Sequence, residues 1–269
     1  MPGLVVVIPT HSRPALLAEA VAGCVPWPVV VVDDSAEGLP AMAGVRWVRS
    51  AGETGFARAV NLGLTAAAGM GARAALVLND DAVPLAGCIE RLAGVWETQG
   101  GAVGPIIEDS DGHVTSAGIQ LASWGRLREG RTAPGGGVHR VDALSGACLM
   151  VGTSWRLDPS FRHGMEDIAL CQRIRAAGGR VSLVGDARCR HVGGATVDRR
   201  SPQAQRAAVS GHLRLVKGGP RTPIVLGLAV AQVVREGGGP GRLRAVAAGW
   251  RDWRRSNCPT RHSSFQPRA

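Results

Sequence analysis

The stretch LVVVIPTHSRPALLAEAVAGC, residues 4–24, joins a buried-strand pattern directly to a helical pattern. Residues 4–10 are an unbroken run of mostly β-branched side chains, which is typical of a strand covered on both faces. After Pro14, apolar side chains recur at helical spacing, at Leu16, Leu17, Ala20, Val21 and Cys24. A buried strand that leads straight into a helix is the repeating unit of a parallel α/β sheet.

The same alternation continues along the chain. PVVVVDDS (28–35), GVRWVRS (44–50) and AALVLNDD (74–81) read as strands, and residues 55–70 read as a helix. Because most of these strands are apolar throughout, we expect a mostly parallel, Rossmann-like sheet with helices on both faces.

The second half of the body is less regular. Residues 104–140 are rich in glycine and polar residues, and they predict two short strands around a turn, followed by a loop. A strand is expected at 141–151, and an amphipathic helix at 164–179, which Gly178 ends. A further strand follows this helix.

Charge divides the chain into two parts. Residues 1–198 carry 17 basic and 19 acidic groups, whereas residues 199–269 carry 14 basic and 2 acidic groups. We therefore predict one domain at 1–200 and a basic helical extension at 201–269 with a disordered end at 256–269. A basic tail on a near-neutral body suggests an anionic partner for the tail alone, and no nucleic acid for the body.

Cysteine spacing and hydropathy indicate a cytoplasmic protein. The six cysteines are scattered without a C-x-x-C pair, so we expect reduced thiols and no zinc site. The N-terminal apolar run has no basic region before it, which predicts no signal peptide. The longest apolar stretch, at 223–234, is too short to span a bilayer.

Three predicted strands end in polar signatures, PTHSR, DDS and NDD. Ligands of parallel α/β sheets bind beyond the carboxyl ends of the strands, where these residues would converge. The adjacent carboxylates of Asp80 and Asp81 repel each other and are costly to bury without a cation. The alternative is that the strand simply ends there, and that both acids are solvated or cap a helix.

Seven features in order resemble the inverting family 2 glycosyltransferases with the GT-A fold, in particular their rhamnosyltransferase-like branch. They are VVVIPTHSRP (5–14), VVVVDDS (29–35), ETGFARAVNLGL (53–64), LVLNDDAVP (76–84), LSGACLMV (144–151), GMEDIALCQRIRAAGG (164–179) and His191. No single motif is specific, but their order and spacing are, over roughly residues 3–198. The resemblance implies an enzyme that binds a UDP-, dTDP- or GDP-linked sugar.

The resemblance implies a set of donor-binding residues at the strand ends. Asp33 or Asp34 suits the imide N–H of a uracil or thymine, and Thr10 and Arg13 could hold base and ribose. The alternative for Arg13 is a solvated helix start. The full expected set is Pro9, Thr10, Arg13, Asp33, Asp34, Gly55, Arg58, Asn79 and Asp80.

A divalent metal is expected beside the diphosphate, because the leaving group departs as an anion. Family members hold it with a D-x-D-type motif, and here Asn79 replaces the first acid of that motif. We expect Asp81 and His191 as ligands, although a structural role for His191 is the alternative. Oxygen ligands favour Mg²⁺ or Mn²⁺.

Glu166 and Asp167 resemble the acidic pair of the family. An acceptor hydroxyl needs a carboxylate to take its proton, and we expect Asp167 as this base, with Glu166 binding the acceptor or orienting the sugar. The alternative is that the pair only caps the helix that begins near Met165. Gly146 is expected at the acceptor, because a small residue lets the backbone approach it.

Residues 242–255, RLRAVAAGWRDWRR, form a basic amphipathic pattern with two tryptophans on its apolar face. This pattern is typical of a helix on a membrane surface, here the inner face of the membrane. The alternative is a helix that packs on the catalytic domain. Nucleic-acid binding ranks third, because no reader motif is present.

The sequence therefore predicts a metal-assisted inverting transferase that moves a sugar to a hydroxyl of a glycan, lipid-linked or natural-product acceptor. No Q-x-x-R-W follows the acidic pair, which argues against a processive polysaccharide synthase. One alternative is a sugar-1-phosphate nucleotidyltransferase, although the first strand lacks its long Gly-rich basic loop. The other is a non-catalytic module that binds a sugar nucleotide or docks on a membrane.

Overall fold

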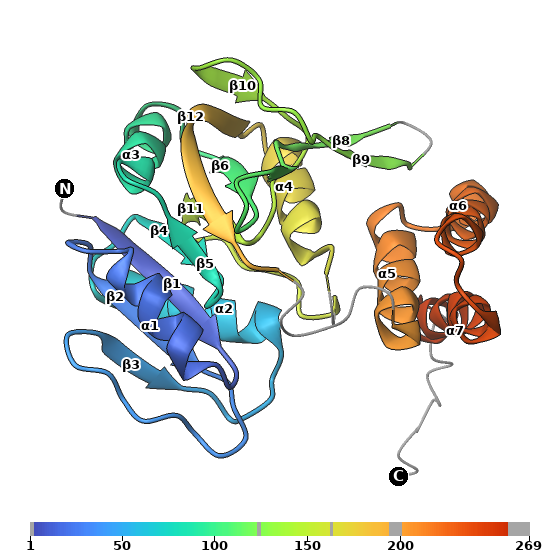
Figure 1. Cartoon of the computed structure of the whole chain (residues 1–269), viewed down its shortest axis with the longest axis horizontal. Helices are drawn as coiled ribbons and strands as arrows, with labels where there is room; N and C mark the ends of the chain where they lie inside the picture. Colours follow the sequence, from blue (N-terminus) through green and yellow to red (C-terminus); the bar gives the residue numbers. More distant parts are fainter. Residues whose placement is uncertain (1–2, 123–124, 162–163, 194–200, 258–269) are drawn as a thin grey trace, which may run out of the picture. The chain divides into compact units, whose positions relative to one another are not determined.

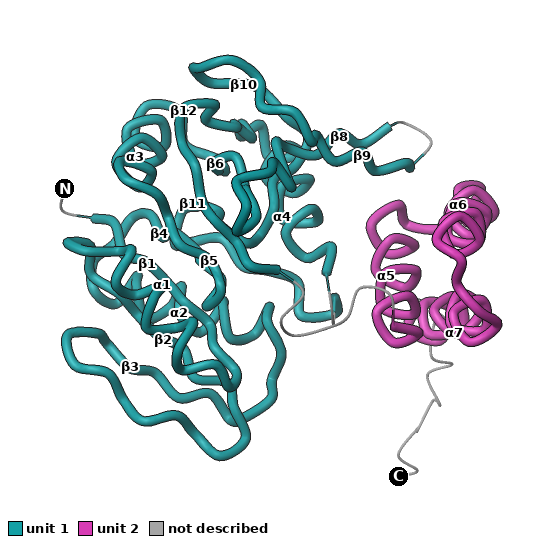
Figure 2. The backbone as a smooth tube through the Cα atoms, in the orientation of Figure 1, with its two compact units in different colours: residues 1–199 teal, residues 200–269 magenta. Residues whose placement is uncertain are grey.

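A computed structural model of the chain describes residues 3–122, 125–161, 164–193 and 201–257. The chain divides into two compact units, Met1–Arg199 and Arg200–Ala269, which Figure 2 colours separately. Most of the end that the sequence predicts to be disordered, from residue 258 onward, lies outside the described residues.

The first unit is built on one mixed sheet (Figure 1). Its strands are β1 (Leu4–Thr10), β2 (Val29–Asp33), β3 (Arg46–Arg49), β4 (Ala74–Leu78), β5 (Ala82–Pro84), β6 (Ala102–Glu108), β7 (Val114–Ser116), β10 (Val138–Arg140), β11 (Cys148–Gly152) and β12 (Val181–His191). Their order is β10-β12-β6-β11-β4-β1-β2-β3, with β5 paired to β12 and β7 to β6. A separate two-stranded sheet joins β8 (Ile119–Leu121) and β9 (Leu127–Glu129).

The predicted fold class is confirmed: a mostly parallel sheet is flanked by helices. β4, β1, β2 and β3 run parallel, and β1, β2 and β4 are buried along their whole length. β11 lies between β4 and β6 and is antiparallel to both. Its unbroken apolar pattern could not reveal this direction, because a strand buried on both faces has the same pattern in either orientation.

Helices cover both faces of the sheet. The first unit contains α1 (Pro14–Ala22), α2 (Phe56–Gly69), α3 (Cys88–Gln99) and α4 (Glu166–Ala176). Leu17 of α1 and Leu92 of α3 share one core cluster with Val6 and Ile8 of β1. α2 lies against Val7, whose side chain points to the opposite face.

A glycine allows the close approach of α2 to the sheet. A Cβ atom on Gly63 would lie 2.2 Å from Cγ1 of Val7 and 3.0 Å from Cγ2 of Val32. Any side chain at this position would therefore force the helix away from β1 and β2.

The second unit consists of α5 (Pro202–Leu215), a 3₁₀ turn (Gly219–Arg221), α6 (Thr222–Arg235) and α7 (Pro240–Asn257). α5 begins at Ser201, whose hydroxyl caps the helix by accepting from the N–H of Ala204. Val209 and Leu213 of α5, Val225 and Val233 of α6, and Val246 of α7 form its core.

The apolar face of α7 faces the interior of this unit. Trp250 and Trp253 are half-buried and pack against the core cluster of the second unit. The tryptophans of α7 therefore pack within the second unit, whereas the sequence pattern predicted a membrane surface or the first domain as their partner. The hydrophobic spacing was interpreted correctly, but α5 and α6 supply the partner surface.

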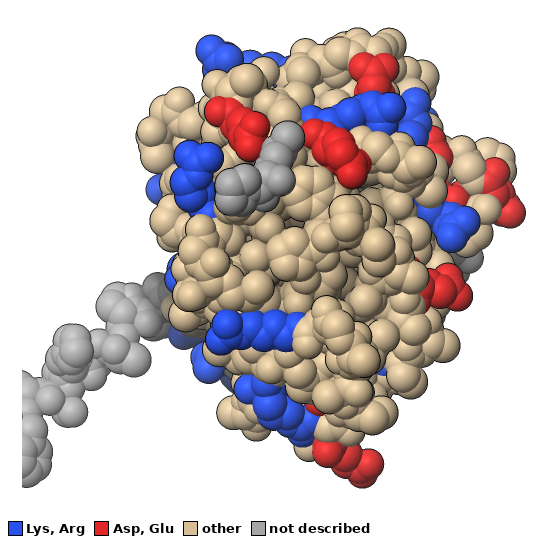
Figure 3. All heavy atoms as spheres, turned by 90° about the vertical axis from the view of Figure 1, so that its left-hand side faces the viewer, with Lys and Arg blue, Asp and Glu red and all other residues tan. Residues whose placement is uncertain are grey.

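Charged side chains are dispersed on the face drawn in Figure 3, where basic and acidic groups are scattered among uncharged ones. Among the described residues, no helix is both long and apolar enough to cross a membrane.

Candidate active site

Four strand ends meet at one edge of the sheet. β1, β2 and β4 are parallel, and β12 runs in the same direction because two antiparallel pairings, β4 with β11 and β11 with β6, precede its parallel pairing with β6. This edge therefore carries the polar residues that follow β1, β2 and β4 and the end of β12.

Asp80 is buried against the carboxyl end of β1 and the residues just after it. Thr10 Oγ1 donates to its Oδ2 at 2.8 Å, and a guanidinium nitrogen of Arg13 lies 2.5 Å from its Oδ1. Burial raises the pKa of Asp80 above its usual value, and the nearby charge of Asp81 adds to this, although Thr10 and Arg13 oppose it. Thr10 and Arg13 thus contact the two carboxylates, and their contacts with a base and ribose stay a prediction.

Asp81 lies between Arg13 and His191. The other terminal guanidinium nitrogen of Arg13 donates to Oδ2 of Asp81 at 3.1 Å, and Nε2 of His191 is 3.0 Å from Oδ1. Burial alone would raise the pKa of Asp81, but the contact with His191 and the charge of Arg13 outweigh it and lower the pKa. The predicted metal ligands, Asp81 and His191, are therefore neighbours.

The Nε2 atom of His191 lies close to both a hydrogen-bond donor and a hydrogen-bond acceptor. Nε2 lies 3.3 Å from the amide nitrogen of Asn79, a donor, and 3.0 Å from Oδ1 of Asp81, an acceptor. A single ring nitrogen cannot accept from one and donate to the other in the same tautomer. Oδ1 of Asn79 and Oδ1 of Asp81 are both buried, and apart from the 3.0 Å contact of Asp81 with His191 neither has a hydrogen-bond donor among the described residues. Two orphaned oxygens beside an imidazole nitrogen fit the ligand set of a divalent cation.

Both carboxylate oxygens of Asp33 accept hydrogen bonds from other residues of the protein. Asp33 is 0% exposed, and its Oδ1 accepts from the N–H and hydroxyl of Ser35. Its Oδ2 accepts from the N–H of Leu39 and pairs with Arg49. Burial works against ionisation, but these donors outweigh it and lower the pKa of Asp33. A nucleobase could reach this carboxylate only by displacing an internal partner.

Asp34 holds the loop before α2. Its Oδ1 accepts from the Ser50 hydroxyl and from the N–H and hydroxyl of Thr54, while its Oδ2 accepts from the N–H of Gly55 at 2.8 Å. Although burial opposes ionisation, these bonds lower the pKa of Asp34. Gly55 precedes α2 with φ 91°, a conformation that favours glycine.

Pro9 and Arg58 differ in their access to solvent. Pro9 is buried within β1, whereas Arg58, in the first turn of α2, is exposed. Arg58 forms no ion pair with a described residue. Its guanidinium can therefore bind an anion at the N-terminal end of α2, near Asp34.

The acidic pair opens α4, and the two carboxyl groups differ in environment. Asp167 accepts from the N–H of Gly146 at 2.7 Å and from the N–H of Ile168 at 2.8 Å. Burial raises its pKa, and these two donors oppose the rise. Glu166 is buried, its Oε2 has no hydrogen-bond partner among the described residues, and burial together with the charge of Asp167 raises its pKa to about 8.

A short backbone segment connects the two groups of acids. Gly146 donates to Asp167, and the next residue, Ala147, accepts from the N–H of Asn79 at 3.0 Å. A Cβ atom on Gly146 would lie 3.2 Å from Oδ2 of Asp167. The predicted acceptor glycine therefore contacts the predicted base and lies next to the Asn79–Asp81 segment.

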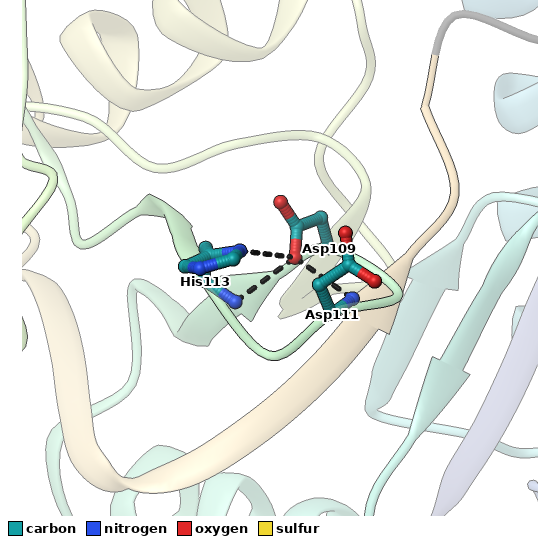
Figure 4. A group of neighbouring side chains, drawn as sticks. All are labelled: Asp109, Asp111 and His113. Carbon is teal, nitrogen blue, oxygen red and sulfur yellow. Dashed lines mark hydrogen bonds and ion pairs between the residues drawn. The ribbon is translucent and has the colours of Figure 1, made fainter.

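A second acidic group lies in the turn between β6 and β7 (Figure 4). Asp109, Asp111 and His113 have ligand atoms within 4.8 Å of one another. Oδ1 of Asp109 accepts from the N–H groups of Asp111 and His113, and this bonding within the turn accounts for the arrangement. The sequence alone predicts only a turn here.

Residues 5–145, more than half of the chain, match the sequence model of glycosyl transferase family 2. The chain belongs to this family. No curated protein sequence matches it.

The fold of this family 2 glycosyltransferase also occurs in solved structures. The structure of GalNAc-T7 with UDP, GalNAc and Mn²⁺ superposes with a TM-score of 0.59 at 15% identity, covering 80% of this chain and 47% of that one. This chain thus spans about half the length of that neighbour, and the likeness confirms the GT-A fold. A197 from STIV has a TM-score of 0.47 at 11% identity over 70% of this chain and 85% of that one. Mannose-1-phosphate geranyltransferase from Thermus thermophilus has 0.41 at 16% identity over 77% and 79%.

Sequence reasoning missed the residues that support the site of this glycosyltransferase. Arg49, Ser50 and Thr54 satisfy Asp33 and Asp34 across sequence distances that no local pattern reveals. The sequence placed Arg49 near the end of the strand predicted at 44–50, and the structure pairs this strand with β2 so that Arg49 lies opposite Asp33.

Proposed function

We propose that this glycosyltransferase transfers a sugar from a nucleoside-diphosphate sugar to an acceptor hydroxyl by a single, inverting displacement. The observation that carries the proposal is the hydrogen-bonded segment 146–147. It joins the acidic pair at the start of α4 to the Asn79–Asp81 group at the carboxyl edge of the sheet. A base and a diphosphate-binding group at fixed positions are what such a displacement requires.

A divalent cation, Mg²⁺ or Mn²⁺, would be held by Asp81 and His191, with Asn79 beside them. Support comes from the poorly satisfied Oδ1 atoms of Asn79 and Asp81. It also comes from Nε2 of His191, which cannot accept from Asn79 and donate to Asp81 at the same time. The GalNAc-T7 structure was solved with UDP and Mn²⁺, and the Asp109–His113 turn offers an Asp-Asp-His group elsewhere in this chain. When bound, the cation would offset the negative charge of the departing diphosphate.

Asp167 would act as the base. It takes the proton of the acceptor hydroxyl while the acceptor oxygen bonds to the anomeric carbon and the bond from that carbon to the diphosphate breaks. Each of its oxygens accepts one backbone N–H, which favours the ionised form and leaves a second lone pair free for the acceptor proton.

Glu166 would keep its own proton near neutral pH, because its pKa is raised to about 8. One proton shared by two neighbouring carboxyl groups resides on the group whose anion is less well stabilised, and Oε2 of Glu166 has no donor among the described residues. A protonated Glu166 can donate a hydrogen bond to an oxygen of the acceptor or of the transferred sugar, the role that the sequence analysis gave it.

Donor binding would use the remaining residues of the edge. Arg58 is exposed and without an ion-pair partner among the described residues, so it suits a phosphate. Thr10 and Arg13 can contact the nucleotide if they release Asp80 and Asp81. Asp33 or Asp34 would contact the base, together with the backbone around Pro9 and Gly55, by exchanging an internal hydrogen bond for one to the base.

The decisive experiment incubates the protein with UDP-, dTDP- and GDP-sugars and Mn²⁺ and measures the release of nucleoside diphosphate. Slow release, increased by an acceptor sugar, supports the transferase, and the anomeric configuration of the product tests inversion. Pyrophosphate release from a nucleoside triphosphate with a sugar-1-phosphate would establish the nucleotidyltransferase alternative. Nucleotide binding with no release of either would favour the non-catalytic module.

A further inference from the structure

Helix α6 is apolar over most of its circumference although it lies at the surface of the second unit (Figure 1). Residues 223–234, PIVLGLAVAQVV, contain no charged side chain. Val225, Ala229 and Val233 are buried and form its inner face. A helix that is apolar all round is normally covered on every side.

The outward face of α6 is exposed and apolar. At 100° per residue, Ile224, Gly227, Val230, Ala231 and Val234 lie opposite the buried stripe. Ile224 is 37%, Val230 42% and Val234 64% exposed, so three large aliphatic side chains of one helix face solvent. Isolated exposed aliphatic residues are ordinary, but a continuous strip of them marks a contact surface.

The charge around α6 indicates what that surface contacts. The described part of the second unit, residues 201–257, has ten basic and two acidic residues, a net charge of +8. Both acids are paired internally, Asp252 with Arg206 and Glu236 with Arg242. Arg221 directly precedes α6 and Arg235 ends it, and both are exposed. An uncharged apolar strip with basic residues at both ends, in a strongly basic unit, complements an anionic lipid surface.

We propose that the outward face of α6 inserts into the headgroup region of an anionic bilayer and holds the protein peripherally on the membrane. This assigns membrane contact to α6, where the sequence pattern pointed to α7, whose tryptophans pack inside the unit. At 14 residues α6 is too short to span a bilayer, so it lies in the interface. The inference stands independently of the reaction proposed above.

The test is co-sedimentation of the full chain with phosphatidylcholine vesicles, with and without phosphatidylglycerol. The wild-type protein should bind the vesicles that contain phosphatidylglycerol and not those of phosphatidylcholine alone. The double variant Val230→Gln/Val234→Gln should bind at least about tenfold more weakly, because the apolar contact area is lost. Glutamine has a higher helix propensity than valine, so both exposed positions should tolerate it.

Val138→Gln is the matched control, because Val138 is 43% exposed but lies on β10 of the first unit. It should bind like the wild type. The proposal is overturned if phosphatidylglycerol does not increase vesicle binding of the wild type, or if the α6 variant binds as well as the wild type. It is equally overturned if the control variant loses as much binding as the α6 variant. It is also overturned if the α6 variant lowers the melting temperature or converts a dimer to a monomer, since the face would then cover protein.

Discussion

The backbone N–H of Gly146 donates a hydrogen bond of 2.7 Å to Oδ2 of Asp167. The contact links the loop before β11 to the first turn of α4, and a side chain on residue 146 would press on the carboxylate, since a Cβ atom there lies 3.2 Å from Oδ2. Gly146 therefore both leaves room for the carboxylate of Asp167 and fixes its orientation. A base with a fixed orientation loses little entropy when the acceptor arrives.

Replacement of Asp167 by asparagine should remove the proton acceptor while keeping the shape of the side chain. We expect turnover to fall by about 10²–10⁴ with the dissociation constant of the nucleotide sugar unchanged. Glu166→Gln is the companion variant, and it should weaken acceptor affinity more than donor affinity. The measurements are donor binding by calorimetry and turnover by nucleoside diphosphate release. Turnover of Asp167→Asn within about threefold of wild type would place the base elsewhere.

Removal of Asp81 should weaken metal binding at the sheet edge. Asp81→Ala takes away the orphaned Oδ1 beside His191, so we expect Mn²⁺ affinity to fall at least about tenfold. Asp109→Ala is the matched control, because it removes an aspartate from the Asp-Asp-His group of the β6–β7 turn. Mn²⁺ titrations followed by electron paramagnetic resonance compare the two. The reverse ranking would move the metal to the β6–β7 turn.

Stability should depend on pH through Glu166. Its pKa in the folded protein is about 8, well above the ordinary 4.5, so the folded state holds a proton that the unfolded state releases. This contribution to stability is complete below about pH 4.5 and is lost as the pH rises to about 8, with a slope of up to ~1.4 kcal/mol per pH unit. Glu166→Gln should remove this slope. Urea unfolding of both proteins at several pH values measures it, and equal slopes would contradict an ionisable Glu166 in this environment.

Two glycines of α2 should respond oppositely to alanine. At Gly63 a Cβ atom would clash with Val7, so Gly63→Ala should destabilise the first unit by about 1–3 kcal/mol. At Gly69, in the same helix, nothing lies within 4 Å of the added atom, and Gly69→Ala should stabilise by roughly 0.5–1 kcal/mol. Chemical denaturation gives both values. A neutral Gly63→Ala would mean that α2 does not pack this closely on β1.

The strand and helix alternation of the first unit is local information, which is why it could be predicted. Runs such as residues 4–10 and 28–35 have the side chains of strands buried on both faces, and β1 and β2 are buried throughout. The polar residues at their ends could be assigned to one edge because parallel strands end together. The order of the motifs along the chain likewise indicated the family, and the match over residues 5–145 confirms it.

The partners of these residues were decided by the tertiary structure. Asp33 and Asp34 look like free ligand-binding acids in sequence, but Arg49, Ser50 and Thr54 occupy them after the chain returns to the sheet edge. The tryptophans of α7 have the spacing of a membrane helix, but α5 and α6 cover them, while the exposed apolar strip lies on α6. Spacing along the chain determines which side chains share a face, because the backbone period is local. What covers that face depends on contacts between distant segments, which form only when the whole unit folds.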